Sequence, residues 1–304
     1  MGCRTPQRGP LMTATTEQAE ERTVIRRPGL YDLPEHIYHA DPVPGGSLSS
    51  TGARRLLECP ARFRYEQAHP PAPRPHFDFG TAAHKLVLGV GPELAVLDYP
   101  DWRTKAAREA ARKARERGAI PLKRGDYEQI QAMAEALKSH PVAGPIFTES
   151  AGRAEQSLFW QDSDTRVVCR ARIDHLPHPT QQGRLILADY KTCATADPNK
   201  LPRVIVDHGY HLQAAWYIDG VRALGLAEDV AFLFVFQEKQ APYLVTVVEL
   251  DHEALTIGSY LAREARQRYA TCRRTGNWPG YADDAPVVVS LPSYYTQQYE
   301  GASL

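Results

Sequence analysis

Apolar residues recur every three or four positions in the first half of the chain, which predicts helices over 50–59, 80–89 and 126–140. Ser49 or Ser50 is placed to cap the first helix, and Pro141 follows the end of the third. Residues 101–120, DWRTKAAREAARKARERGAI, predict a further helix that is strongly basic. The proline-rich residues 70–79 predict a loop.

The second half changes to strand-like patterns. Apolar residues predict strands over 154–162, 165–176 and 184–192, with the segment PHPTQQG as the turn between the last two. A helix over 209–225, strands over 229–238 and 243–251, and a long helix over 252–276 follow. This order predicts one mixed α/β domain over residues 29–304, with a helical N-terminal elaboration, preceded by a polar and disordered tail over 1–28.

The composition is that of an ordinary globular protein, with 304 residues, 43% hydrophobic and 24% charged. The formal net charge is zero, so any positive surface for nucleic acid must be local. The chain contains no apolar run of roughly 18–20 residues, so we expect no membrane span. Five scattered cysteines and an N-terminus without an apolar core indicate reduced thiols and a cytoplasmic location.

The strand RLILADYKT carries two opposite charges at its end. Asp189 and Lys191 are two positions apart, so their side chains lie on one face of the strand. Alone, the pair would be an ordinary salt bridge. A hairpin with the preceding strand brings Asp174 beside Asp189, and two carboxylates about 4–5 Å apart repel unless a cation lies between them. Oxygen ligands of this kind suit Mg²⁺.

Further polar residues share faces with this pair or with one another. Gln213 and Tyr217 lie four positions apart on one helix face, where they could hold water or phosphate, or be a surface residue and a core residue. His84 follows Gly80 at the same spacing, although a lone histidine is more often structural. Arg170 and Arg172 share the strand face of Asp174 and could either position a phosphate or bridge carboxylates.

The segments GTAAHKLVLG, CRARIDHL, ADYKT and GYHLQAAWYIDG resemble, in this order, motifs of the PD-(D/E)xK nuclease superfamily. Within its RecB-like branch, the chain is most similar to the RecE (exonuclease VIII) nuclease domain of phages and prophages, over about residues 30–295. The resemblance implies a restriction-endonuclease-like α/β core, in which helices flank a central mixed β-sheet. It implies a catalytic core of Asp174, Asp189 and Lys191, organised by Gln213 and Tyr217. Metal ligands would be His84, Asp174, Asp189 and the carbonyl of Tyr190, with Glu155 as a possible acidic neighbour.

The same resemblance implies an Mg²⁺-dependent exonuclease, with Mn²⁺ as a possible substitute, that digests linear double-stranded DNA from 5′ to 3′. The 3′ single strands would pass to a RecT-like annealing protein, and the enzyme would be a ring-shaped homo-oligomer in a bacterial or phage-infected cell. An iron–sulfur cluster is not expected, because Cys272 stands alone where such enzymes have clustered cysteines.

DNA is also the partner that the basic segment 103–125 indicates, with nine Lys or Arg against two Glu. Arg112, Lys113 and Arg115 are its candidate phosphate contacts, although a solvated helix face competes as an explanation. Two other functions stay open, namely a nuclease of different polarity that acts on single strands, and a non-catalytic DNA-binding module on the same fold. The chain has no Walker motif, so we expect no fused helicase.

Overall fold

The computed structural model describes residues 23–69, 75–148, 150–178, 184–282 and 285–300. At its centre is a mixed β-sheet whose described strands run in the order β1-β5-β6-β7-β8-β9, with β2 paired to β6. Strands β7 and β8 are parallel, whereas β6–β7 and β8–β9 are antiparallel. The strands are β1 (Gly29–Asp32), β2 (Leu48–Ser49), β5 (Gly152–Gln161), β6 (Val168–Pro177), β7 (Leu185–Cys193), β8 (Val230–Glu238) and β9 (Val245–Glu249).

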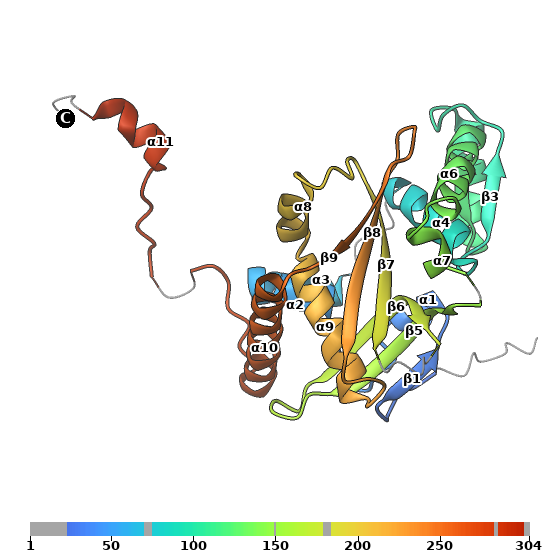
Figure 1. The fold of residues 1–304 in the computed structure, drawn as a ribbon. Coiled ribbons are helices and arrows are strands. Elements are labelled where there is room, and N and C mark those ends of the chain that lie inside the picture. Colours follow the sequence, from blue (N-terminus) through green and yellow to red (C-terminus); the bar gives the residue numbers. More distant parts are fainter. Residues whose placement is uncertain (1–22, 70–74, 149, 179–183, 283–284, 301–304) are drawn as a thin grey trace, which may run out of the picture.

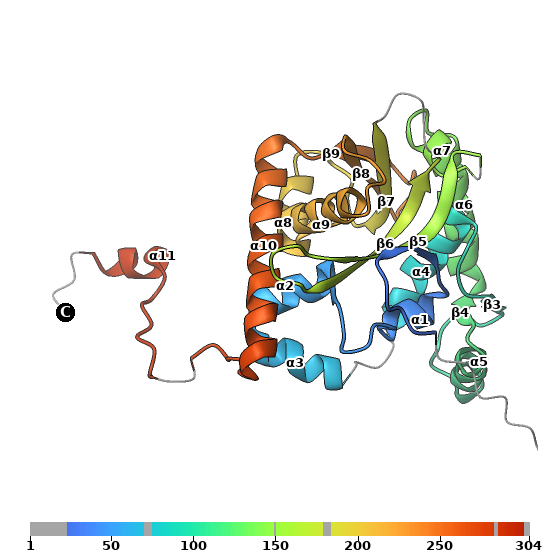
Figure 2. The same ribbon diagram turned by 90° about the horizontal axis from the view of Figure 1, so that it is seen from below.

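Helices cover both faces of this sheet, as Figures 1 and 2 show. One face packs against α9 (Tyr210–Ala223), which is held in turn by α10 (His252–Thr275) and α2 (Ser50–Glu58). The other face, with Tyr190 and Val235, packs against α4 (Pro75–Leu88) and α6 (Arg124–Lys138). The predicted fold class, a central mixed sheet flanked by helices, is therefore confirmed.

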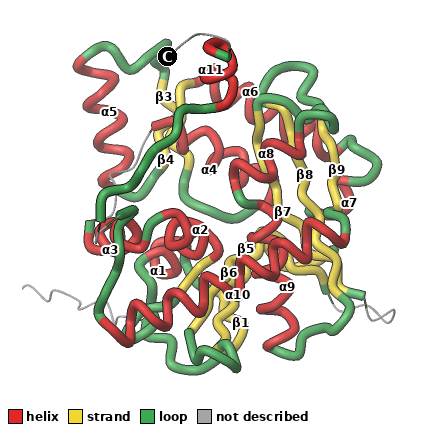
Figure 3. Tube along the Cα trace, turned by 90° about the vertical axis from the view of Figure 1, so that its left-hand side faces the viewer, coloured by secondary structure: helices red, strands yellow, loops and turns green. Residues whose placement is uncertain are grey.

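Smaller elements surround this core, and Figure 3 shows their positions along the chain trace. A two-stranded sheet of β3 (Leu94–Leu97) and β4 (Ile120–Lys123) lies beside α5 (Lys105–Glu116) and α6. The remaining elements are α1 (Glu35–His39), α3 (Pro60–Ala68), α7 (Ala143–Ile146), α8 (Leu201–His208), α11 (Ser293–Thr296) and a 3₁₀ turn over Gln297–Tyr299.

The main predicted elements are present, with shifted ends. The three central strands lie within three residues of their predicted limits, and Ser49 caps α2 by accepting a 3.1 Å hydrogen bond from the Gly52 N–H. The predicted loop over 70–79 is wrong in part, because α4 begins at Pro75. A further helix, α3, starts at Pro60, since proline is well tolerated in the first turn of a helix.

On the N-terminal side, packing begins earlier in the chain than the sequence analysis predicted. Residues 1–22 of the predicted tail lie outside the described residues, as does most of the predicted turn over 177–183. Ile25 is buried, and its N–H donates a 2.9 Å hydrogen bond to the Pro42 carbonyl, so packing begins upstream of residue 29. No helix of the described chain is both long enough and apolar enough to cross a membrane.

Helix α9 lies close to its neighbours on both sides because two glycines lack a Cβ. A Cβ on Gly220 would lie 2.8 Å from the ring of Trp160 in β5. A Cβ on Gly258 of α10 would lie 2.1 Å from the carbonyl oxygen of His211. The helix is thereby fixed between the sheet and α10, and this fixes the helix face that carries Gln213.

Candidate active site

Three carboxylates lie on adjacent strands of the central sheet. His175 of β6 pairs with Ala188 of β7, so one step along each strand brings Asp174 opposite Asp189. The register of β5 on β6 places Glu155 across from Asp174 on the other side. The predicted proximity of Asp174 and Asp189 is present in the structure, and Glu155 extends this row to a third strand.

Asp174 is the central member of this row and is buried, with 9% of the residue exposed. Its Oδ2 accepts a 2.8 Å hydrogen bond from the backbone N–H of Tyr190 and lies 3.5 Å from Nδ1 of His84. Burial, and then the charge of Asp189, raise the pKa of Asp174 well above its usual range. A carboxylate in this position gains most from a bound cation, because the cation would offset both effects.

His84 projects from α4 toward Asp174. Burial, followed by the charge of Lys191, lowers its pKa to about 4, so the imidazole is neutral at pH 7 and the contact to Asp174 is not an ion pair. The ring also hydrogen bonds to the backbone of Tyr190, where the carbonyl is the acceptor. Its edge packs on the Tyr190 ring at 5.2 Å between centroids. A neutral imidazole fixed in this way has a nitrogen suited to a metal ion.

Glu155 joins His84 and Asp174 in a possible metal site, because one ligand atom of each lies within 4.8 Å of the others. Its backbone has a φ of 56°, the left-handed region that a non-glycine residue occupies only at a cost of roughly 1–3 kcal/mol. An ion pair with Arg172 holds its carboxylate. The sequence indicated Glu155 only as an acidic neighbour, whereas the structure places it among the possible ligands.

Asp189 lies outside this group of three, and its carboxylate has other partners. Its Oδ1 accepts a 2.6 Å hydrogen bond from Nε2 of Gln213, and its Oδ2 pairs with Nζ of Lys191. Tyr217 is buried one turn further along α9, and burial raises its pKa well above the usual range. The predicted group of Asp189, Lys191, Gln213 and Tyr217 is thus gathered at one place.

Lys191 carries a full charge in this environment. Burial opposes its charged form, but the carboxylates of Asp189 and Asp174 outweigh burial and raise its pKa. The ammonium also lies 5.3 Å from the centre of the Tyr210 ring. A lysine in this state is suited to stabilising negative charge.

Arg170 and Arg172 each form an ion pair with a carboxylate. Arg170 pairs with Asp41 at 2.6 Å and donates a 2.7 Å hydrogen bond to Ser47 Oγ, while Arg172 pairs with Glu155. Both guanidinium groups lie over the ring of Tyr38, at 5.4 and 5.7 Å from its centre. Of the two roles that the sequence left open, these contacts favour one toward the protein's own carboxylates over the positioning of a phosphate.

The three candidate phosphate contacts of the basic helix α5 lie close to acidic residues. Arg112 pairs with Glu109 and Glu116, and Arg115 pairs with Asp78 at 2.5 Å. Lys113 lies 3.9 Å from Glu109. None of these three cations is among the residues that line the cleft described next.

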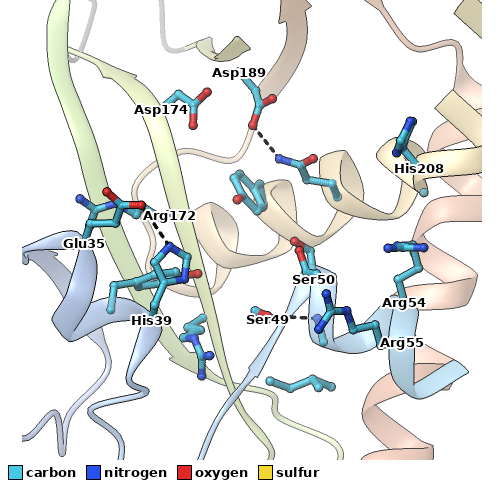
Figure 4. A pocket seen from close by; sticks show the side chains of 18 of the residues that line it. Glu35, His39, Ser49, Ser50, Arg54, Arg55, Arg172, Asp174, Asp189 and His208 are labelled. Atoms are coloured by element: carbon cyan, nitrogen blue, oxygen red, sulfur yellow. Dashed lines mark hydrogen bonds and ion pairs between the residues drawn. The ribbon is translucent and has the colours of Figure 1, made fainter. Parts of the chain in front are cut away.

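The carboxylates open into a cleft of about 1940 Å³. Figure 4 shows Asp174 and Asp189 on their strands, with Ser49, Ser50, Arg54 and Arg55 on the facing wall and His208 to one side. The cations that line it, apart from the residues already described, come mainly from helices: Arg54, Arg55, Arg64, Lys85, Lys239 and Arg273. The sequence analysis missed this set, because its members are scattered over separate elements.

The donor atoms fit a hard divalent cation such as Mg²⁺ or Mn²⁺. Carboxylate oxygens from Glu155 and Asp174 are the ligands that such ions prefer, and the neutral His84 nitrogen and the Tyr190 carbonyl are compatible with them. The raised pKa of Asp174 is a second sign of fit, because it reflects burial and then the charge of Asp189, and a bound cation would offset both.

A mixed sheet with these side chains on adjacent strands is the arrangement of a PD-(D/E)xK-like protein. The sequence matches a family model described as "PDDEXK-like domain of unknown function (DUF3799)" over residues 49–289, and the chain belongs to this family. The superfamily that the motifs indicated is thus confirmed.

Comparison with solved structures agrees with the fold. The chain is similar to a crystal structure of a protein from Eubacterium rectale described as a "putative exonuclease", with a TM-score of 0.53 and 11% identity, over 96% of this chain and 100% of that chain. A crystal structure of SSO0001 has a TM-score of 0.32 and 15% identity, over 73% and 75% of the two chains, which is too low to support any conclusion. No curated protein matches the sequence.

Proposed function

We propose that this protein is an Mg²⁺-dependent exonuclease that hydrolyses phosphodiester bonds of linear double-stranded DNA. The observation that carries the proposal is the row of Glu155, Asp174 and Asp189 beside His84 and a charged Lys191, at the base of a cleft lined by cations. The family match and the similarity to a protein described as a "putative exonuclease" support the same chemistry.

Each side chain has a role that follows from its contacts. Glu155, Asp174 and His84 would hold the cation, which when bound polarises the scissile phosphate and lowers the pKa of water. Lys191 stabilises the charge that develops on the phosphate, because it is held as an ammonium. Gln213 fixes the rotamer of Asp189 through their 2.6 Å hydrogen bond. The leaving group is a 3′-oxyanion, which gives 5′-phosphate products.

The resemblance to RecE supports further parts of the proposal: digestion from 5′ to 3′, delivery of 3′ tails to a RecT-like annealing protein, a ring-shaped homo-oligomer, and a cytoplasmic location in a bacterial or phage-infected cell. A non-catalytic DNA-binding module is disfavoured by the complete set of Asp174, Asp189 and Lys191. Degenerate sites lose such residues.

The test compares linear and closed circular duplex DNA in Mg²⁺ and in EDTA, with Lys191→Ala and the surface variant Lys138→Ala as the matched control. We expect wild type and Lys138→Ala to release 5′-terminal nucleotides from linear DNA only, and Lys191→Ala to be slower by about 10²–10³-fold. Equal activity of Lys191→Ala would disprove the assigned site, and cutting of closed circles would disprove the exonuclease assignment.

A further inference from the structure

A second groove continues from the cleft onto helix α3. Arg64, Gln67 and Trp278 line both the cleft and this groove, whose volume is about 510 Å³. Its other walls are formed by residues of α3 and its C-cap: Ala61, Tyr65, Ala68 and His69. The groove therefore extends the cleft away from the carboxylates, along the side of the molecule where α3 lies beside the end of α10 (Figures 2 and 3).

Flat aromatic surfaces line this groove. Tyr65 is 64% exposed, and its ring stacks on that of His69 at 4.2 Å with 17° between the planes. Trp278 is half-buried and packs on the buried ring of Phe63 at 5.9 Å and 28°. Because Phe63 and Tyr269 fix Trp278 from the core side, its ring is held in place before any partner arrives.

The cations of this helix are not neutralised. In the described part of the chain, neither Arg62 nor Arg64 forms an ion pair with a carboxylate. Their guanidinium groups lie 5.5 Å from the ring centres of Tyr281 and Trp278. Helix α5 differs in this respect, because its Arg112 and Arg115 form ion pairs with acidic residues.

We propose that this α3 surface (Arg62, Arg64, Tyr65, His69, Trp278 and Tyr281) binds a single strand of DNA by stacking on its unpaired bases, next to the phosphates that occupy the cleft. This inference rests on the proposed function. Stacking on aromatic rings combined with unneutralised arginine is the chemistry that binds single strands without sequence preference. The continuity of groove and cleft favours the same DNA chain in both.

Binding can be measured apart from hydrolysis by using the full chain in EDTA and a fluorescein-labelled oligo-dT, with fluorescence anisotropy as the readout. Tyr65→Ala and the double variant Arg62→Ala/Arg64→Ala alter exposed side chains, so the fold is kept. Tyr65→Phe keeps the ring. Tyr260→Ala removes a tyrosine of α10 that is 57% exposed and does not line the groove, and is the matched control.

We expect Tyr65→Ala to weaken oligo-dT binding by about tenfold, and Tyr65→Phe and Tyr260→Ala to bind like wild type. The double arginine variant should bind more weakly and lose about 1.4 from the slope of log affinity against log salt. Unchanged affinity in Tyr65→Ala would overturn the proposal, as would an equal loss in Tyr65→Phe or Tyr260→Ala.

The same variants are assayed on linear duplex with Mg²⁺ or Mn²⁺, so that the two proposals fail separately. If wild type hydrolyses the duplex and Tyr65→Ala binds oligo-dT as tightly as wild type, only the proposal for the α3 surface is disproved. Tyr65-dependent binding by a protein that hydrolyses nothing would disprove the nuclease and support the α3 surface.

Discussion

Replacement of Glu155 by Gln tests whether this residue is a metal ligand, a role that the structure supports although the sequence indicated only an acidic neighbour. The substitution keeps the shape of the side chain and removes its charge, next to Asp174 and His84. Arg172 loses its carboxylate but keeps hydrogen bonds of 2.8 Å to the Leu33 carbonyl and 3.0 Å to Ser157 Oγ. We therefore expect a loss of only about 1–2 kcal/mol in the free energy of unfolding in EDTA.

The effect on metal binding should be larger. Two unit charges 4 Å apart interact by about 4 kcal/mol at an effective dielectric constant of about 20. Part of this is recovered because the amide is less costly to bury, so we expect a net loss of about 2.7 kcal/mol, or on the order of a hundredfold in Kd. At a metal concentration about 100 times the wild-type Kd, binding stabilises wild type by about 2.7 kcal/mol and the variant by about 0.4 kcal/mol.

The assay is thermal unfolding in EDTA and in increasing Mn²⁺, with each protein compared with its own EDTA value. At roughly 2–4 °C per kcal/mol, wild type should rise by about 5–11 °C and Glu155→Gln by about 1–2 °C. Glu35→Gln is the control, because Glu35 lines the same cleft but lies outside the group of possible ligands. An equal rise in Glu155→Gln and wild type would refute the assignment of Glu155 as a ligand.

Two further predictions concern pH and packing. Burial lowers the pKa of His84 to about 4, so in EDTA this residue costs stability as pH falls from 6.5 toward 4, because only the unfolded chain takes up the proton. The raised pKa of Asp174 acts in the opposite direction, so the quantity to measure by urea unfolding is the difference in free energy of unfolding between His84→Asn and wild type. The variant should become more stable relative to wild type as the pH falls. A difference that does not change with pH would contradict this. Gly258→Ala should cost about 1–3 kcal/mol and reduce hydrolysis, because its Cβ would press on the carbonyl of His211 in α9. Gly125→Ala, with no atom within 4 Å of its Cβ, should instead gain about 0.5 kcal/mol; equal effects of the two alanines on urea unfolding would contradict the close packing of α9.

The strands that carry the site were predictable because their signal is local. Alternating apolar residues around Asp174 and Asp189 set the strand period, and the spacing of Gln213 and Tyr217 sets a helix face. The position of Glu155 was not predictable in the same way. It depends on a left-handed backbone and on Arg172 across the sheet, and neither is written in the residues next to it.

Charge was the property that the sequence predicted least well. The basic helix α5 stood out as a DNA contact, but its Arg112 pairs with Glu109 and Glu116 three or four positions away, and its Arg115 pairs with Asp78 from another helix. The first two pairs are readable from helical spacing, whereas the third depends on tertiary packing. Arg64 of α3 belongs to no basic run in the sequence, so only the fold shows that it lies beside the cleft.

Strand-specific hydrolysis of a linear duplex labelled at its 5′ ends tests the central claim most directly. The measurement is the release of labelled nucleotides by wild type and by Asp174→Asn, each in Mg²⁺ and in EDTA. The account predicts release by wild type in Mg²⁺ only and a loss of about 10³-fold or more in Asp174→Asn, since this residue lies at the centre of the row of carboxylates. Release that persists in EDTA, or in Asp174→Asn at the wild-type rate, would contradict it.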